Sequence, residues 1–515
     1  MILILPEGLD LAQHIRLHPP ANYGIKKFRI ELAEYLVTLI FQIPAHNKKL
    51  AESIVDGYVP MNAQLLQKRC GKKDYRTYLD YLLHTGILQS DNYFISSKWG
   101  FSGKSRGYRL ANRSENKGFK FKPITDRKLR RTLFRELKEN ADPEYSHLTK
   151  WLGAKSLLTI DLPAAMLYLE ELRDFWLNNP ELNAEQNVKF RLEISKGKSK
   201  KISVPKDPRV QFDYAYINAL TIYQRAIYSQ VDVNVGRLHT PLTNSKSELR
   251  HFITHGKERL VSIDLKNSQP YLSNIFFNPA FWSVSEEKIA KNEAKNSDKV
   301  DFRSMKATFK FLLNTNNHKL PQTNSTPLII LGEMSKLIDI EMVKFDEEKI
   351  LSEVEQYKKL TSDGSLYEYL KDEFSVVLGS AFKNKRAVKS IIFTVFFTDN
   401  RYQDEVKQLF KKLFPVVTKI FSIIKRKDRT ILPRLLQSIE AYLFLQVITK
   451  EVARINSRIP LYTIHDSIVT TEQYVPVVRK VMREVLTRYI GAVPTFSEEK
   501  WSPSELPTFE RVKVA

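Results

Sequence analysis

Two aspartates stand where a strand ends or turns, and this residue type suits metal-assisted phosphoryl chemistry. Asp264 ends the alternating pattern "RLVSIDL", and Asp466 follows His465 between "LYTI" and "SIVTT", two segments typical of short strands. His-Asp is a poor turn pair, because tight hairpins favour Asn-Gly or Asp-Gly. Two carboxylates meeting on one sheet would hold divalent cations at reacting phosphates. For Asp264 alone, a plain strand end followed by a turn is the competing interpretation.

A third segment, "KNKRAVKSIIFTVFFTDN" at residues 383–400, carries two lysines and two phenylalanines at intervals of four: Lys385, Lys389, Phe393 and Phe397. This spacing places them along one face of a helix whose other faces are apolar and expected to be buried. The cations would meet the phosphates of a nucleoside triphosphate, and a ring would stack on its base or sugar. Lysines that merely extend to water from the helix end are the alternative.

Together, the three segments resemble motifs A, B and C of the family A DNA polymerases and the related single-subunit phage RNA polymerases. Asp264 corresponds to the motif A aspartate, and His465 with Asp466 corresponds to motif C. The lysine and phenylalanine stripe is similar to motif B, where Phe397 replaces a tyrosine. Gln269 departs from the DNA polymerases, which carry a glutamate at this position.

Two more stretches fit the order of that family, so the resemblance covers residues 233–474. "NVGRLHTPLTN" resembles a segment that contacts primer and template, and "DRTILPRLLQSIEAYLF" resembles the helix that follows the fingers. The resemblance implies nucleic-acid contacts at Arg237, Arg429, Gln437 and His465. It implies nucleotide contacts at Lys385, Arg386, Phe393, Phe397 and Gln269.

The implied reaction is attack of a primer 3′-hydroxyl on the α-phosphate of a bound nucleoside triphosphate. Asp264 and Asp466 would be the metal ligands for two Mg²⁺ ions, with Mn²⁺ as the alternative, and Lys389 would assist the leaving group. The expected partners are a primed DNA template, with RNA left open, and nucleoside triphosphates. The implied fold is α+β and mainly helical: a right-hand polymerase with a small antiparallel palm sheet and helical fingers and thumb.

The composition agrees with a polyanionic partner. In 515 residues, 81 Lys and Arg stand against 58 Asp and Glu, a net charge of +23. Cys70 is the single cysteine, which excludes disulfide frameworks and cysteine-based zinc sites. We find no apolar stretch near the roughly 18 residues that a membrane span needs, so we expect a cytoplasmic protein without membrane segments.

Three regions are expected along the chain. Residues 1–113 predict a winged-helix-like, nucleic-acid-binding domain, because two helical patterns break at Gly71 and precede strand-like pieces around a basic loop. Its DNA-facing residues would be Lys72, Lys73, Arg76, Lys104 and Arg106, although a protein-docking module is the alternative. Residues 114–232 predict a basic helical, thumb-like linker. Residues 233–515 predict palm and fingers, with an exposed, lysine-rich insertion at about 283–306.

Two other functions compete with a DNA polymerase. A non-catalytic DNA-binding replication initiator or regulator would use the N-terminal domain and a degenerate palm. An RNA polymerase or a template-independent nucleotidyltransferase would keep the catalytic residues. Whether the role is plasmid, phage or mobile-element replication, repair or defence stays open.

Overall fold

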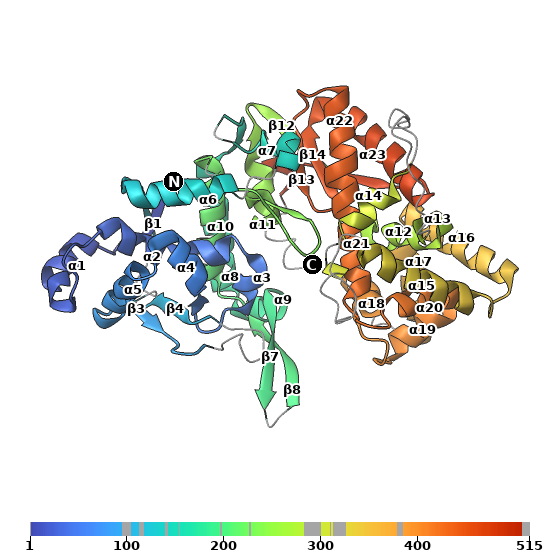
Figure 1. The fold of residues 1–515 in the computed structure, drawn as a ribbon, viewed down its shortest axis with the longest axis horizontal. Helices are drawn as coiled ribbons and strands as arrows, with labels where there is room; N and C mark the ends of the chain where they lie inside the picture. Colours follow the sequence, from blue (N-terminus) through green and yellow to red (C-terminus); the bar gives the residue numbers. More distant parts are fainter. Residues whose placement is uncertain are drawn as a thin grey trace.

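The computed structural model shows a mainly helical α+β protein with several small antiparallel sheets (Figure 1). The structure describes residues 2–94, 105–112, 118–139, 143–153, 155–195, 198–225, 228–282, 300–309, 311–312, 326–378 and 385–506. Lys104 and the larger part of the insertion, 283–299, lie outside these residues.

The N-terminal part has a hydrophobic core of its own. Its elements are β1 (Ile2–Pro6), α1 (Leu11–Leu17), α2 (Ile30–Ala45), α3 (Lys48–Ser53), β2 (Val59–Pro60), α4 (Ala63–Cys70), α5 (Asp74–His84), β3 (Leu88–Ser90), β4 (Gly107–Leu110), β5 (Phe119–Pro123) and α6 (Arg127–Glu139). Three short strands form a sheet in the order β2-β4-β3, and β1 pairs with β5. Because β5 and Leu129 of α6 join this core, the core extends beyond residue 113.

The turn between α4 and α5 lies where the sequence pattern breaks. Gly71 has φ +100°, a backbone conformation that side chains with a Cβ rarely adopt, so a glycine ends α4 here. Asn62 caps the start of α4 by accepting from the backbone N–H groups of Gln64 and Leu65. The helix–turn–helix geometry therefore follows from local residue choices.

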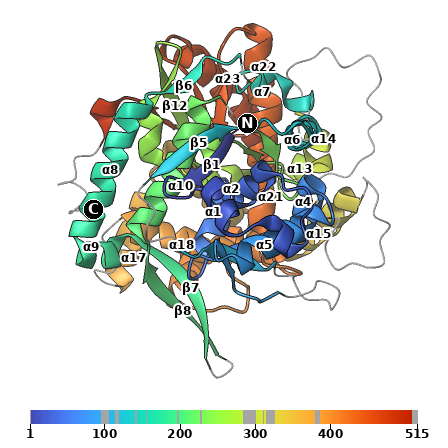
Figure 2. The same ribbon diagram turned by 90° about the vertical axis from the view of Figure 1, so that its left-hand side faces the viewer.

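A middle region connects the N-terminal part to the large sheet. It contains α7 (Ser146–Thr149), β6 (Leu158–Ile160), α8 (Leu162–Asn178), α9 (Pro180–Gln186), β7 (Val188–Ser195), β8 (Lys198–Pro205) and α10 (Pro208–Tyr223). The hairpin β7–β8 projects from the body in both views (Figures 1 and 2). Helix α10 joins two cores, because Ile217 packs with the N-terminal part while Ala219 and Ile222 pack beneath the large sheet.

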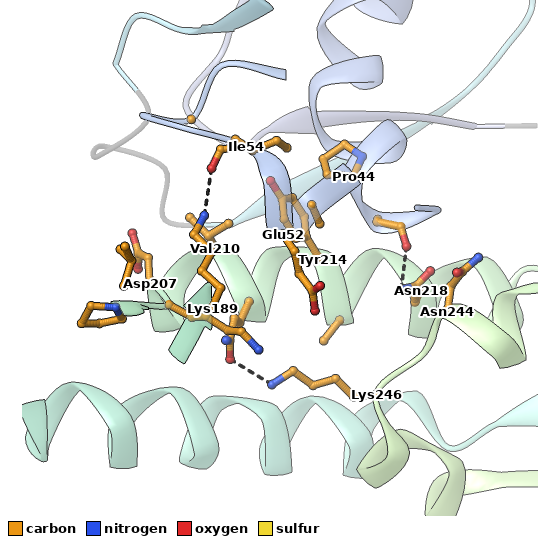
Figure 3. A pocket seen from close by; sticks show the side chains of 18 of the residues that line it. Pro44, Glu52, Ile54, Lys189, Asp207, Val210, Tyr214, Asn218, Asn244 and Lys246 are labelled. Atoms are coloured by element: carbon orange, nitrogen blue, oxygen red, sulfur yellow. Dashed lines mark hydrogen bonds between the residues drawn. The ribbon is translucent and has the colours of Figure 1, made fainter. Parts of the chain in front are cut away.

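A cavity of about 500 Å³ lies beside α10 at this junction (Figure 3). Asn218 and Lys189 tie its walls together: Asn218 Nδ2 donates to the Ala45 carbonyl at 3.0 Å and Lys189 Nζ to the Ile54 carbonyl at 2.8 Å. Polar contacts as well as apolar packing therefore join the N-terminal part to the middle region.

The large sheet is antiparallel and has six strands in the described residues. Its order is β13 (Tyr462–Ile464), β14 (Ser467–Thr471), β12 (Glu258–Leu265), β11 (Ile253–His255) and β6, and β15 (Phe496–Lys500) also pairs with β12. Alternate residues of β12 face opposite sides. Val261 and Ile263 pack into the core shared with the C-terminal helices, whereas Leu260 packs against α8 and α10.

The first of these faces shares one hydrophobic core with a large group of helices (Figure 1). They are α12 (Ser268–Leu272), α13 (Pro279–Trp282), α14 (Phe302–Ala307), α15 (Thr326–Met342), α16 (Glu347–Asp363), α17 (Leu366–Leu378), α18 (Lys385–Phe397), α19 (Glu405–Leu413), α20 (Pro415–Ile424), α21 (Ile431–Tyr442), α22 (Thr449–Ile455) and α23 (Val475–Ile490). The short helix α11 (Pro241–Asn244) instead packs through Leu242 into the core on the other face. A short pair, β9 (Gln230–Val231) and β10 (Leu238–His239), precedes the sheet.

Two expectations need correction here. The insertion is not exposed at its end, because Phe302 and Met305 of α14 are buried in the core. Among the described residues, one helical run, Ile431–Ile455, is also long and apolar enough to cross a membrane by length and composition. This run is 72% buried inside the protein, as the core helix of a globular fold is.

Candidate functional site

The sheet brings Asp264 and Asp466 together. Strand β12 pairs with β14 in a register that places Asp264 opposite Ser467, next to the β13–β14 turn. The Leu265 N–H donates to the Asp466 carbonyl at 3.3 Å, and Ser467 Oγ donates to Asp264 Oδ1 at 2.5 Å. Asp264 at the end of β12 thus lies beside Asp466 in the β13–β14 turn, although 202 positions separate them in the sequence.

The turn itself explains how a poor turn pair is accommodated. The two turn residues are His465 and Asp466. Asp466 has a negative φ, whereas His465 adopts φ +55°, a left-handed conformation that tight hairpins use. Such a conformation costs free energy in a non-glycine residue, so flanking contacts must hold it. The strands on either side supply them, since Tyr462, Ile464 and Val469 are buried against α8 and α10.

Both aspartates have raised pKa values. Burial is the main cause that raises the pKa of Asp466 to about 7, and the charges of Glu440 and Asp264 add to it. Burial likewise raises the pKa of Asp264, whereas the Ser467 hydrogen bond and the charge of Lys389 lower it. Carboxyl groups whose pKa values are raised by burial and by neighbouring acids are typical of functional sites.

Glu440 is a third carboxylate at this site, and the sequence motifs did not indicate it. It lies on α21 with 1% of its surface exposed. Arg237 Nη2 lies 2.8 Å from Glu440 Oε1 and 2.8 Å from Oε2, and Gln269 Nε2 donates to Oε2 at 2.9 Å. A glutamate within an apolar helix is rarely buried without a partner, and that signal alone could have drawn attention to it.

Arg250 is a second group near Asp264 that the motifs missed. It lies in a short 3-10 helix, Ser247–Phe252, just before β11. Burial is the main cause that lowers the pKa of its guanidinium, while the charges of Glu499 and Asp264 raise it. Glu499 on β15 pairs with Ser262 on β12, two residues before Asp264. The side chain of Glu499 therefore lies on the same sheet face as that of Asp264. This face therefore combines acidic and basic groups around Asp264.

Helix α18 carries the predicted stripe on its exposed side. Lys389 is exposed and Phe393 is 59% exposed, while the rings of Phe393 and Phe397 are 5.2 Å apart between centroids. The opposite side is buried as expected, through Val388, Ile391, Ile392, Val395 and Phe396. Lys385 and Arg386 belong to the helix, but their side chains lie outside the described residues. The influence of Lys389 on Asp264 connects the stripe to the aspartates.

The other predicted residues divide into two groups. Arg237, Gln269 and His465 lie at or beside the aspartates, and the His465 ring stands edge-on to His239 at 6.4 Å between centroids. Gln437 is half-buried on α21, and Arg429 is exposed just before that helix.

The basic residues of the N-terminal part lie on a separate surface. Lys72, Lys73 and Arg76 are exposed at the start of α5, and the half-buried Arg106 guanidinium lies 5.8 Å from the centroid of the Phe94 ring. These residues belong to the N-terminal core region rather than to the sheet that holds the aspartates.

The residues present fit a magnesium site at which the protein supplies only part of the ligands. Among the described residues, no three His, Cys, Asp or Glu side chains are grouped as a ready metal cage. Mg²⁺ is commonly held by only one or two carboxylates, with waters and substrate phosphates as the other ligands. Asp264 and Asp466 supply that number, and burial, the main cause of their raised pKa values, keeps both carboxyl groups partly away from water.

No family model matches this chain, and no curated protein matches it. One solved structure that matches is described as the POL domain of Pol1 from M. smegmatis in complex with DNA primer-template and dNTP. It is 14% identical, the match covers 68% of this chain and 68% of that chain, and the TM-score is 0.26. A likeness at this level supports no statement about activity.

Proposed function

We propose that this protein is a template-directed nucleotidyltransferase, and specifically a DNA polymerase that extends a primer. The observation that carries the proposal is the meeting of Asp264, on β12, with Asp466, in the β13–β14 turn beside it. Both carboxyl groups have raised pKa values, and the charge of Lys389 acts on Asp264. Two half-buried carboxylates beside a basic and aromatic helix face suit phosphoryl transfer, in which positioning and charge compensation carry most of the catalysis.

Each residue has a distinct part in the proposed reaction. Asp264 and Asp466 hold two Mg²⁺ ions, which supply activation of the primer 3′-hydroxyl and neutralisation of the leaving phosphates when bound. The hydrogen bond from Ser467 fixes Asp264 through Oδ1. Lys389 binds the pyrophosphate group and donates a proton to it. Lys385 and Arg386 hold the terminal phosphates.

The aromatic stripe provides the rest of the nucleotide site. Phe393 is largely exposed on a helix whose other side is fully packed, so its ring is available to a ligand. In the proposal it packs on the sugar and base of the nucleotide, and Phe397 supports it from the next turn.

The test is primer extension. The protein is incubated with a labelled primed DNA template, Mg²⁺ and either dNTPs or NTPs, and products are resolved by length. Asp264→Asn and Asp466→Asn should each abolish extension while primed-DNA binding stays nearly unchanged. Asp339→Asn, at an exposed aspartate of α15, is the matched control and should extend like the wild type. Substantial extension by either active-site variant would refute the assignment.

A non-catalytic DNA-binding initiator is the second candidate, favoured by one observation. Lys72, Lys73 and Arg76 are exposed together at the start of the second helix of a helix–turn–helix. That protein would bind duplex DNA tightly and incorporate no nucleotide. Faster use of NTPs than dNTPs in the same assay would instead identify an RNA polymerase, and extension without a template would identify a terminal nucleotidyltransferase.

A further inference from the structure

Glu440 connects three segments that are distant in the sequence. Arg237 lies between β9 and β10, Gln269 lies on α12 directly after β12, and Glu440 lies on α21. Its carboxylate accepts hydrogen bonds from both other residues, at 2.8 Å and 2.9 Å. Asp264 and Asp466 lie close enough for their charges and that of Glu440 to affect one another.

Glu440 Oε2 accepts from both Arg237 Nη2 and Gln269 Nε2, and this contact decides how Gln269 is oriented. The amide must turn its NH₂ group toward Glu440, so its carbonyl oxygen points elsewhere. That oxygen, Gln269 Oε1, is buried and has no hydrogen-bond partner among the residues that the structure describes. A buried acceptor without a partner is costly, and at a functional site it indicates a donor that arrives with the ligand.

The same carboxylate also limits the freedom of Arg237. The Arg237 side chain is 21% exposed, and its Nη2 is occupied by Glu440. Its Nε is buried and has no hydrogen-bond partner in the described part of the chain. Arg237 therefore keeps donors available in a fixed plane, and Gln269 keeps an acceptor available beside it.

We propose that Glu440 is a positioning residue of the nucleotidyl-transfer site, which holds Arg237 and sets the orientation of the Gln269 amide beside the two aspartates. This inference rests on the proposed function. Glu440 touches no substrate itself. It presents one donor group and one acceptor group in fixed geometry, which is the arrangement that lets binding align a substrate with reacting groups.

The experiment exchanges charge without changing shape, because Glu and Gln have the same size. Glu440→Gln removes the carboxylate, and Gln269→Glu places two carboxylates in contact. The exchange variant, Glu440→Gln with Gln269→Glu, restores one carboxylate and one amide with their positions reversed. For each full-length protein we measure kcat and KM for correct dNTP incorporation, and the Kd for primed DNA in the presence of EDTA.

Each single variant should lower kcat/KM by about tenfold or more, because misplaced contacts near a reacting centre are costly. The exchange variant should recover activity to within about threefold of the wild type, since contacting residues are energetically coupled. The Kd for primed DNA should stay within about threefold throughout, because all variants keep the exposed cations that dominate affinity.

Glu451→Gln is the matched control. It breaks another glutamate–arginine pair in the same helical run, Glu451 with Arg488 at 2.6 Å, and should leave kcat/KM unchanged. A merely structural role for Glu440 would lower primed-DNA binding and folded yield together, with no recovery on exchange.

The outcomes separate the two proposals. Normal kcat/KM in Glu440→Gln, or no recovery in the exchange variant, overturns the role of Glu440 and leaves the polymerase standing. Failure of the wild-type protein to extend any primer overturns both.

Discussion

Replacing Asp466 with asparagine should make the protein more stable above neutral pH while it abolishes extension. The pKa of Asp466 is about 7 in the folded protein, against an ordinary value of 3.8 that applies once the chain unfolds. Between these values, the folded protein binds a proton that the unfolded chain releases. The free energy of unfolding therefore falls as the pH rises through this window.

The magnitude follows from the difference between the two values. About 3 pH units, at about 1.4 kcal/mol each, give a penalty of about 4 kcal/mol that is fully present at pH 8. At pH 5 the folded protein is largely protonated at Asp466, and the penalty is below about 2 kcal/mol. Asparagine has the same shape and no charge, so Asp466→Asn should remove most of this penalty.

Urea unfolding in EDTA at pH 5 and pH 8 measures the effect, followed by tryptophan fluorescence. Trp282 and Trp501 report on the two sides of the large sheet, because both are buried in its cores. Asp466→Asn should exceed the wild type by about 2–4 kcal/mol at pH 8 and by clearly less at pH 5. Mg²⁺ should stabilise the wild type at pH 8 and the variant much less. An Asp466→Asn protein that is equally or less stable than the wild type at pH 8 would refute this account of the site.

Three further predictions concern the nucleotide and DNA contacts. Phe393→Ala should raise the KM for dNTPs by about tenfold, because it removes stacking worth about 1–3 kcal/mol. The Tm should change little, because the residue is 59% exposed. An unchanged KM would contradict the role of Phe393 in nucleotide binding. Replacing Lys72, Lys73 and Arg76 with glutamine in the full chain should weaken duplex DNA binding, measured by fluorescence anisotropy. The slope of log Kd against log salt concentration should fall by up to about 3. An identical slope would assign this surface to protein docking. The wild type should incorporate dNTPs about ten- to a hundredfold faster than NTPs, since Phe397 has no hydroxyl and Gln269 fills the space of a glutamate. Gln269→Ala should reduce this ratio. Faster use of NTPs by the wild type would contradict the predicted preference.

The sequence was most informative where function and local structure use the same residues. Alternation in "RLVSIDL" and the two segments around His465 predicted strands, and those strands are β12, β13 and β14. Apolar spacing in α18 predicted which side is buried, and Val388 and Phe396 are buried there. The break at Gly71 separates α4 from α5 as expected. These features depend on residues within a few positions of one another, so periodicity reports them.

The N-terminal core shows what such patterns cannot report. β1 and β5 pair across more than 110 positions, which places β5 and α6 with residues 3–110 rather than with the region that follows. Neither strand has a sequence pattern that identifies the strand with which it pairs. The winged-helix interpretation and the roles of the basic residues on this part stay predictions.

Tertiary structure alone decided the composition of the site around the aspartates. Glu440 looks like one polar position in an apolar helix, and Arg237 looks like a free cation available to nucleic acid. In the fold they form an ion pair that spans 203 positions, and Gln269 turns its amide toward the same carboxylate. The sequence determined which residues carry charge and which stretches form strands and helices. Which charges come into contact depends on how those elements pack, because the free energy of a buried ion pair is set by distance and desolvation, and neither exists until the chain has folded.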